Sequence, residues 1–197
     1  MLGIPIAFAV FGYGEWATHK YLLHGRGLDR SSALSFHFHD HHQAVRRNGG
    51  YDPAYEGPVW SSKIQMREAI GLGLVGLAHL PLFPVAPFYT ATIWYCLVRY
   101  RRDHRRAHLD PAWARDHLPW HYDHHMGDQD KNFGVSWSWF DVLAGTRAVF
   151  VGTERERDGL ARHVARAMTA SAGAVLRAQR RSPLRRLFGR TSLARPG

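Results

Sequence analysis

Apolar residues gather in two stretches of the chain, and polar residues fill the segments between and after them. The first stretch is the N-terminus, MLGIPIAFAVFGYGEW. With the residues that follow, it predicts an apolar helix over residues 1–24 that ends near His24 and Gly25, because glycine commonly terminates helices. The stretch has neither the basic start nor the small-residue cleavage site of a secretory signal, so we expect it to be retained.

The second stretch runs from Ala69 to Val98 and contains no formally charged residue over 30 positions. Crossing a bilayer takes about 20 residues for one helix and about 40 for two, so its length fits neither. Three prolines interrupt it, Pro81, Pro84 and Pro87. We therefore expect a helical hairpin that enters the membrane deeply and returns to the same side. One kinked span followed by an interfacial segment is the alternative.

Basic residues predict the orientation. The run RYRRDHRR, residues 99–106, directly follows the apolar stretch, and positive charge of this kind marks the cytoplasmic side of a membrane. The histidine-rich segments lie on that side. The sequence thus predicts an all-α, integral membrane protein whose histidine-rich helical cap lies on the cytoplasmic side.

Helical patterns continue through the polar part of the chain. We expect a helix over residues 33–47, a loop over residues 47–58, continuation of the hairpin's second helix through residues 99–108 and a turn followed by a helix from Leu109. The composition shifts at Glu154, which predicts a membrane-embedded domain over residues 1–153 and a basic tail over residues 154–197. Residues 157–181 fit a basic amphipathic helix that lies on an anionic leaflet, and equally a solvated tail.

Composition narrows the classes of function. A formal net charge of +10 favours anionic surroundings, which include nucleic acid, phospholipid and acidic proteins. The single cysteine, Cys96, excludes an internal disulfide framework and a cysteine-based zinc site. The uncharged stretch, and the lack of an ordered basic and aromatic module, argue against a nucleic-acid partner.

Ten of the 14 histidines fall into four groups with regular spacing. Residues three or four apart share one face of a helix, so most members of each group point the same way. The pair separated by five residues would diverge on an ideal helix unless the end of the helix lets the second ring swing back. The groups are His19 and His24; His37, His41 and His42; His104 and His108; and His121, His124 and His125.

Repetition of the pattern predicts a metal site. Imidazole suits iron, zinc, copper and nickel, and ten nitrogens exceed the four ligands of one tetrahedral zinc, so two metal ions are implied. Five nitrogens for each octahedral ion would leave a position open for water or dioxygen. Asp40, Asp103 and Asp123 lie among the histidines and either orient ligand imidazoles or are solvated acids.

The segments EWATHKYLLHG, FHFHDHHQAVRRNGGYDP, HRRAH and HYDHHMGDQDKNFGVSWSWFDVLAGT resemble, in this order over residues 15–146, the histidine boxes of the fatty acid hydroxylase/sterol desaturase superfamily. The spacings H-x4-H, H-x3-HH, H-x3-H and H-x2-HH match the ten histidines. The opening HKYLLHG is also similar to the related beta-carotene hydroxylases. By this resemblance Asn132 and Asp141, which follow the last box, help to shape the site.

The resemblance implies a membrane oxygenase with two iron ions, for which zinc is a possible substitute. Such an enzyme uses dioxygen to hydroxylate or desaturate a C–H bond of a fatty acyl, sterol, carotenoid or related lipid. We find no second domain that could bind haem, so the electrons are expected from a separate protein such as a ferredoxin, or cytochrome b5 with its reductase. A non-catalytic membrane protein that binds metal is the alternative.

Overall fold

A computed structural model describes residues 2–181 of the chain, and these residues form helices and no strand, which confirms the all-α prediction. The α-helices are α1 (Gly3–Ala17), α2 (Gln43–Arg47), α3 (Lys63–His79), α4 (Pro87–Leu109), α5 (Pro111–His117), α6 (Pro119–Tyr122), α7 (Trp139–Leu143) and α8 (Glu154–Arg181). Three π-helical turns are η1 (Thr18–Leu23), η3 (His37–His42) and η7 (Asp123–Gly127). Short 3-10 turns are η2 (Arg26–Leu28), η4 (Pro53–Tyr55), η5 (Val59–Ser61) and η6 (Leu80–Leu82).

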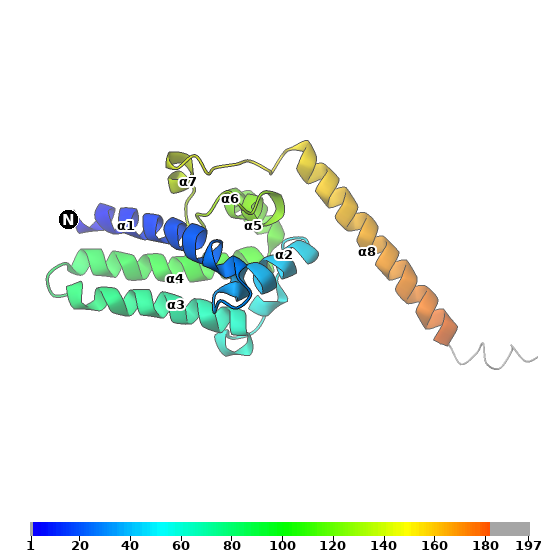
Figure 1. The fold of residues 1–197 in the computed structure, drawn as a ribbon, viewed down its shortest axis with the longest axis horizontal. Helices are drawn as coiled ribbons and strands as arrows, with labels where there is room; N and C mark the ends of the chain where they lie inside the picture. The colour runs from blue at the N-terminus through cyan, green and yellow to red at the C-terminus, as the bar shows by residue number, and fades with distance from the viewer. Residues whose placement is uncertain (1, 182–197) are drawn as a thin grey trace, which may run out of the picture. The chain divides into compact units, whose positions relative to one another are not determined.

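Helix α4 is the centre of the fold, with α1 along one side of it and α3 along the other (Figure 1). Its packing with α1 buries Ala7, Phe11, Ile93, Cys96 and Leu97. Burying such side chains stabilises the fold by about 1.5–3 kcal/mol for each large one. A second apolar cluster, of Ala107, Ala114, Leu118 and Tyr122, lies at the other end of α4, so this helix contributes to both.

The hairpin of α3 and α4 is confirmed. The Ser62 hydroxyl caps α3 by accepting from the backbone N–H of Ile64 and Gln65. The helix gives way to η6 at the first of the three prolines, and Pro87 opens α4 at the position where a missing N–H costs least. As predicted, α4 continues beyond the apolar stretch, and it ends only at Leu109.

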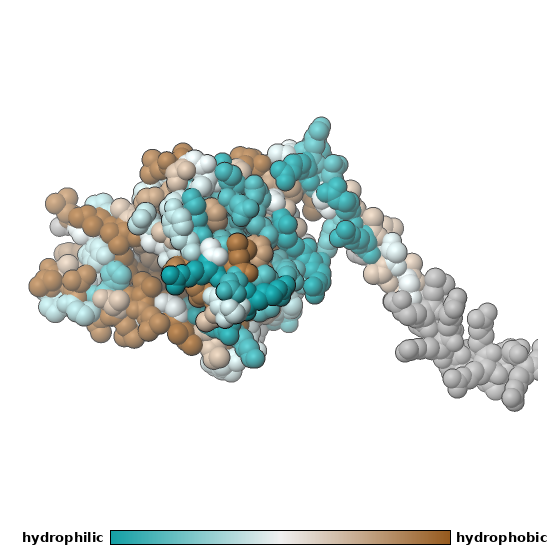
Figure 2. Space-filling view, in the orientation of Figure 1, coloured by the Kyte–Doolittle hydropathy of each residue, from teal (hydrophilic) through white to brown (hydrophobic). Residues whose placement is uncertain are grey.

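Large apolar side chains are exposed at the end of the bundle formed by the start of α1, the end of α3 and the start of α4. Figure 2 shows them as a brown region around the hairpin turn. The clearest examples are Ile6, Leu74, Leu77, Val85 and Phe88. None of the helices formed by residues 2–181 is both long enough and apolar enough to cross a membrane.

Contacts divide the chain into two units, one of residues 1–156 and one from residue 157 onward. In the second unit, α8 exposes Leu160, Val164 and Met168, which lie four residues apart on one face. Part of the tail that we expected after residue 153, residues 182–197, lies outside the described chain.

Gly25 permits a test of the turn that ends η1. A Cβ atom there would lie 2.2 Å from the backbone oxygen of Tyr21, which cannot move without displacing η1. We expect Gly25→Ala to destabilise the protein by about 1–3 kcal/mol, as an overpacked position does. Thermal unfolding followed by circular dichroism measures this. Gly14→Ala is the control, because nothing lies within 4 Å of its new methyl group; equal melting of the two variants would contradict the close approach.

Candidate metal centre

The three π-helical turns decide where the histidines point. On an ideal α-helix, residues five apart diverge by about 140°. In η1 the backbone N–H of His24 instead donates to the oxygen of His19 at 2.9 Å, an i+5 bond that widens the turn and brings the two side chains to one face. His37 and His42, also five apart, are brought together in the same way by η3. Sequence spacing alone did not predict these π turns.

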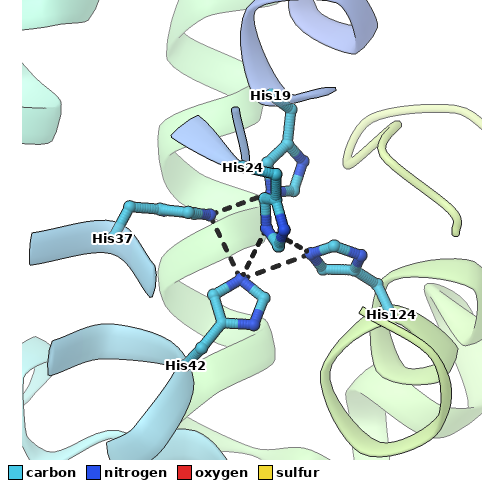
Figure 3. Close-up of side chains that lie close together, drawn as sticks. All are labelled: His19, His24, His37, His42 and His124. Atoms are coloured by element: carbon cyan, nitrogen blue, oxygen red, sulfur yellow. Dashed lines mark hydrogen bonds between the residues drawn. The ribbon is translucent and has the colours of Figure 1, made fainter. Parts of the chain in front are cut away.

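One cluster consists of five buried histidines that each contribute one ring nitrogen to a group of atoms within 4.8 Å of one another: His19, His24, His37, His42 and His124. Figure 3 shows their rings converging from three separate segments of the chain. The Nε2 atoms of neighbouring rings are 2.9–3.3 Å apart. We call this set the first cluster.

The second cluster consists of four buried histidines that meet the same 4.8 Å limit: His41, His104, His108 and His125. His121 stands beside them, since its Nε2 is 3.1 Å from that of His108. All ten histidines of the sequence pattern are therefore buried in these two neighbouring groups.

The two clusters touch each other. The ring centroids of His42 and His125 are 4.2 Å apart, and those of His124 and His125 are 5.2 Å apart. In each of the adjacent pairs His41/His42 and His124/His125, one residue belongs to the first cluster and the other to the second. The double histidines thus join two sites into one centre.

Backbone carbonyls fix the tautomers of two rings in the first cluster. The Nδ1 atoms of His19 and His124 each lie 2.6 Å from a carbonyl oxygen, of Phe133 and Lys131 respectively. A carbonyl only accepts, so each Nδ1 carries the proton and each Nε2 presents a lone pair to the cluster.

Two carboxylates orient histidine rings of the second cluster. Asp52 accepts from His41 Nδ1 at 2.7 Å, and Glu68 accepts from His104 Nδ1 at 2.9 Å. Glu68 also accepts from the hydroxyl of Tyr55 at 2.9 Å. Burial alone would raise the pKa of the Glu68 carboxyl, but His104, Arg101 and Tyr55 outweigh it and lower that pKa.

The orienting carboxylates are not those suggested by the sequence. Asp40 is exposed, Asp103 pairs with Arg99 and Arg102, and Asp123 accepts from Arg147 and from two backbone N–H groups. Their proposed contact with ligand imidazoles was wrong. Asp52 follows the second histidine group by ten residues, and Glu68 directly precedes the apolar stretch. An acid in either position could have been predicted to bind a histidine.

The segment after the last histidine group contains two buried polar side chains, Asn132 and Asp141, which bind backbone groups beside the first cluster. Asp141 is fully buried and accepts from the backbone N–H groups of Phe133 and Gly134, both at 2.8 Å. Asn132 takes a left-handed conformation, with φ 59°, and its side chain binds Ala148. These contacts hold the carbonyls that orient His19 and His124.

The chemistry of these rings suits a cation. Burial is the largest cause that lowers the pKa of the clustered imidazoles, to about 4 for His24 and well below the usual value for His19, His37, His42, His108, His121, His124 and His125. Neutral rings of fixed tautomer turn lone pairs toward one another, and His41 Nε2 and both nitrogens of His125 have no hydrogen-bond partner. Each cluster could hold a metal ion on these nitrogens.

An apolar cavity of about 540 Å³ begins at the two clusters. At its polar end lie His19, His37, His41 and His104, and its walls come from α1, α3 and α4. Its lining also includes Ile93 and Leu97 of α4 and the exposed residues Ile70, Gly71 and Val75 of α3. This volume is within the range of ligand-binding cavities. We call it the channel.

Comparison with known proteins identified no relative: no protein-family model, no curated protein and no solved structure matches this chain.

The two clusters predict separable metal sites. We expect the wild-type protein to bind two metal ions per chain, and His124→Ala and His125→Ala each to weaken one site, because these adjacent residues belong to different clusters. Isothermal titration with Co²⁺, followed by its visible absorption, distinguishes the two sites. His163→Ala, in α8, is the control. If both variants weakened the same single site, the assignment of two clusters would be wrong.

The lowered pKa values predict how the metal-free protein responds to acid. A histidine whose pKa is lower in the folded than in the unfolded protein binds fewer protons when folded, so stability falls as the pH drops below the unfolded pKa of 6.5. Several such groups titrate together, so we expect a loss of more than about 1.4 kcal/mol for each pH unit between pH 6.5 and 5. Urea unfolding in the presence of a chelator measures it; constant stability would contradict the buried, neutral imidazoles.

Proposed function

We propose that this protein is an oxygen-dependent lipid hydroxylase or desaturase with two iron ions in the paired histidine clusters. The observation that carries the proposal is the channel, which joins both clusters to an opening among exposed apolar side chains. A protein that only stores metal has no need of an apolar cavity at its metal centre. The match of all ten histidines to the spacing of the hydroxylase and desaturase boxes supports the same reaction class.

The channel suits an acyl chain or another elongated apolar group. Its lining is dominated by aliphatic and aromatic residues, and polar groups concentrate where it meets the histidines. A C–H bond held at that end would lie against His19, His37 and His41. Packing along Ile93 and Leu97 would position the remainder of the substrate and exclude water.

The ligand set suits iron. Imidazole is a good ligand for this metal, and nitrogen ligands that leave a position open are typical of sites where dioxygen is activated. Bound iron would supply the reduction of dioxygen with two external electrons and two protons, giving an oxidised lipid and water. Carboxylate hydrogen bonds at His41 and His104 would hold these rings in the ligating tautomer.

Glu15 provides a proton-carrying group in the channel wall. Its carboxyl accepts from the backbone N–H groups of Val135 and Ser136, while Oε2 is buried without a hydrogen-bond partner. Burial raises the pKa of this carboxyl to about 7. A group that is partly protonated at neutral pH can hold and pass a proton near the clusters. The sequence analysis did not single out this residue.

The proposed enzyme would attach to a membrane through its exposed apolar side chains. The exposed apolar end of α1, α3 and α4 would enter one leaflet, which would place the opening of the channel among lipid chains (Figure 2). The basic residues that follow on α4 would remain at the cytoplasmic surface.

Electrons would come from a separate ferredoxin, or from cytochrome b5 with its reductase. Arg46 lies at the surface of the centre, where its guanidinium donates to the backbone oxygens of His125 and Gly127, both at 2.7 Å. Basic side chains near the metal site favour an acidic donor protein.

Blocking the channel should stop turnover without removing metal. Gly71 lines the channel, and nothing lies within 4 Å of a Cβ added there, so a larger side chain would enter the cavity without disturbing the helix. We expect Gly71→Leu to keep both metal ions and to lower product formation at least about tenfold, because the substrate could no longer take its reactive position in the channel.

The assay is mass spectrometry of lipids from cells that express the protein, in search of species that gain one oxygen or lose two hydrogens. Ala78→Leu introduces the same side chain at an exposed position of α3 outside the channel, and should retain wild-type product levels. Undiminished product in Gly71→Leu would contradict the role of the channel.

A further inference from the structure

A second hollow, of about 880 Å³, lies on the other side of the contact between α3 and α4. Leu72 and Leu97 line both the channel and this hollow, so these two side chains separate them. The hollow is a shallow groove along the outside of the hairpin, and the metal clusters do not line it. Neither the metal centre nor the proposed reaction gives it a function. We call it the outer groove.

Small residues on α3 create the outer groove. Nothing lies within 4 Å of a Cβ added at Gly73, and Gly76 lies beside Leu97 and Trp94. The indole N–H of Trp94 donates to the backbone oxygen of Gly76 at 3.1 Å, which fixes the ring as one wall. Val98 continues this wall toward the polar end of the hairpin and is 70% exposed. The outer groove is therefore shaped to bind an extended apolar chain.

Three arginines close the polar end of the outer groove: Arg101, Arg102 and Arg105. The contacts of Arg102 and Arg105 each occupy only part of a guanidinium. Arg102 donates one bond to Asp103 at 2.9 Å and is 72% exposed, and Arg105 donates one to the backbone oxygen of Glu56 at 3.2 Å. Arginine has five N–H donors, so most remain available to an anion.

The charge at this end stays positive after its acids are counted. Arg101 is committed to Gln65 and lies 3.6 Å from Glu68. Glu56 is the one carboxylate among the residues that line the groove, and it accepts from the hydroxyl of Tyr51. Asp103 pairs with Arg102 but is shared with Arg99, so four arginines meet three carboxylates at this end, and Arg102 and Arg105 face the opening.

We propose that the outer groove binds one anionic phospholipid, with the phosphate on Arg102 and Arg105 and one acyl chain along Gly73, Gly76 and Trp94. An apolar trough that ends in arginines matches an amphiphile with an anionic head group, since guanidinium binds phosphate oxygens in pairs. The arginines lie where α4 passes from the apolar to the polar end of the fold, which is where a head group would sit. The proposal requires neither bound metal nor enzymatic activity.

The test is native mass spectrometry of the full chain, delipidated in detergent and titrated with phosphatidylglycerol or phosphatidylcholine. We expect one phosphatidylglycerol to bind at least about tenfold more tightly than phosphatidylcholine. The double variant Arg102→Ala/Arg105→Ala should abolish this preference. Each arginine near an anionic head group strengthens binding several-fold.

Two glycine variants separate the outer groove from the channel. Gly73→Leu would fill the groove and should reduce phosphatidylglycerol binding at least about tenfold, whereas Gly71→Leu would fill the channel and should leave it unchanged. Leucine favours helix more than glycine does, so both variants should keep α3 intact, and equal metal content would verify this.

Three results would overturn the proposal: equal binding of the two phospholipids, loss of binding in Gly71→Leu but not in Gly73→Leu, or displacement of phosphatidylglycerol by equimolar oleate. The second would place the lipid in the channel, and the third would make the groove a fatty-acid site. A missing lipid oxidation activity would count against the proposed function and leave this result unaffected.

Discussion

The burial of ten imidazoles in two touching groups is the constraint on which the rest of the structure depends. Neutral rings whose Nδ1–H groups donate to backbone carbonyls or to Asp52 turn lone pairs toward one another, and a buried polar atom without a partner costs about 1–3 kcal/mol. A metal ion, which accepts several lone pairs at once, would relieve this cost. The clusters are therefore the part of the molecule that a bound cation would stabilise most.

Helix α4 connects the chemistry to the surroundings. Its polar half carries His104 and His108, and its apolar half forms the floor of the channel. The same helix presents its other side to the outer groove, with Leu97 between the two spaces. One continuous helix thus gives the metal centre, the proposed substrate path and the proposed lipid site a common frame, so that their spacing is set by helical geometry.

The sequence predicted the helical class, the hairpin broken at its prolines and the grouping of the ten histidines. Hydrophobic periodicity, helix-breaking prolines and histidine spacing are all local signals. The sequence missed features that depend on partners distant in the chain. The π turns at His19–His24 and His37–His42 could not be foreseen from an α-helical period, and Asp52 and Glu68 reach their histidines only once α3, α4 and the loop between η3 and α3 have packed. The aspartates nearest to the histidines in sequence were the natural choice, and they bind arginine or backbone, or face solvent.

The most direct test of the central claim is metal analysis combined with Mössbauer spectroscopy of protein from cells grown on iron-57. The account predicts two irons per chain, both ferrous after reduction, with parameters of nitrogen-rich coordination, and both oxidised when dioxygen is admitted. Protein that takes up no more than one iron, or whose iron stays ferrous in the presence of dioxygen, would contradict a centre of two oxygen-reactive metal ions held by ten histidines.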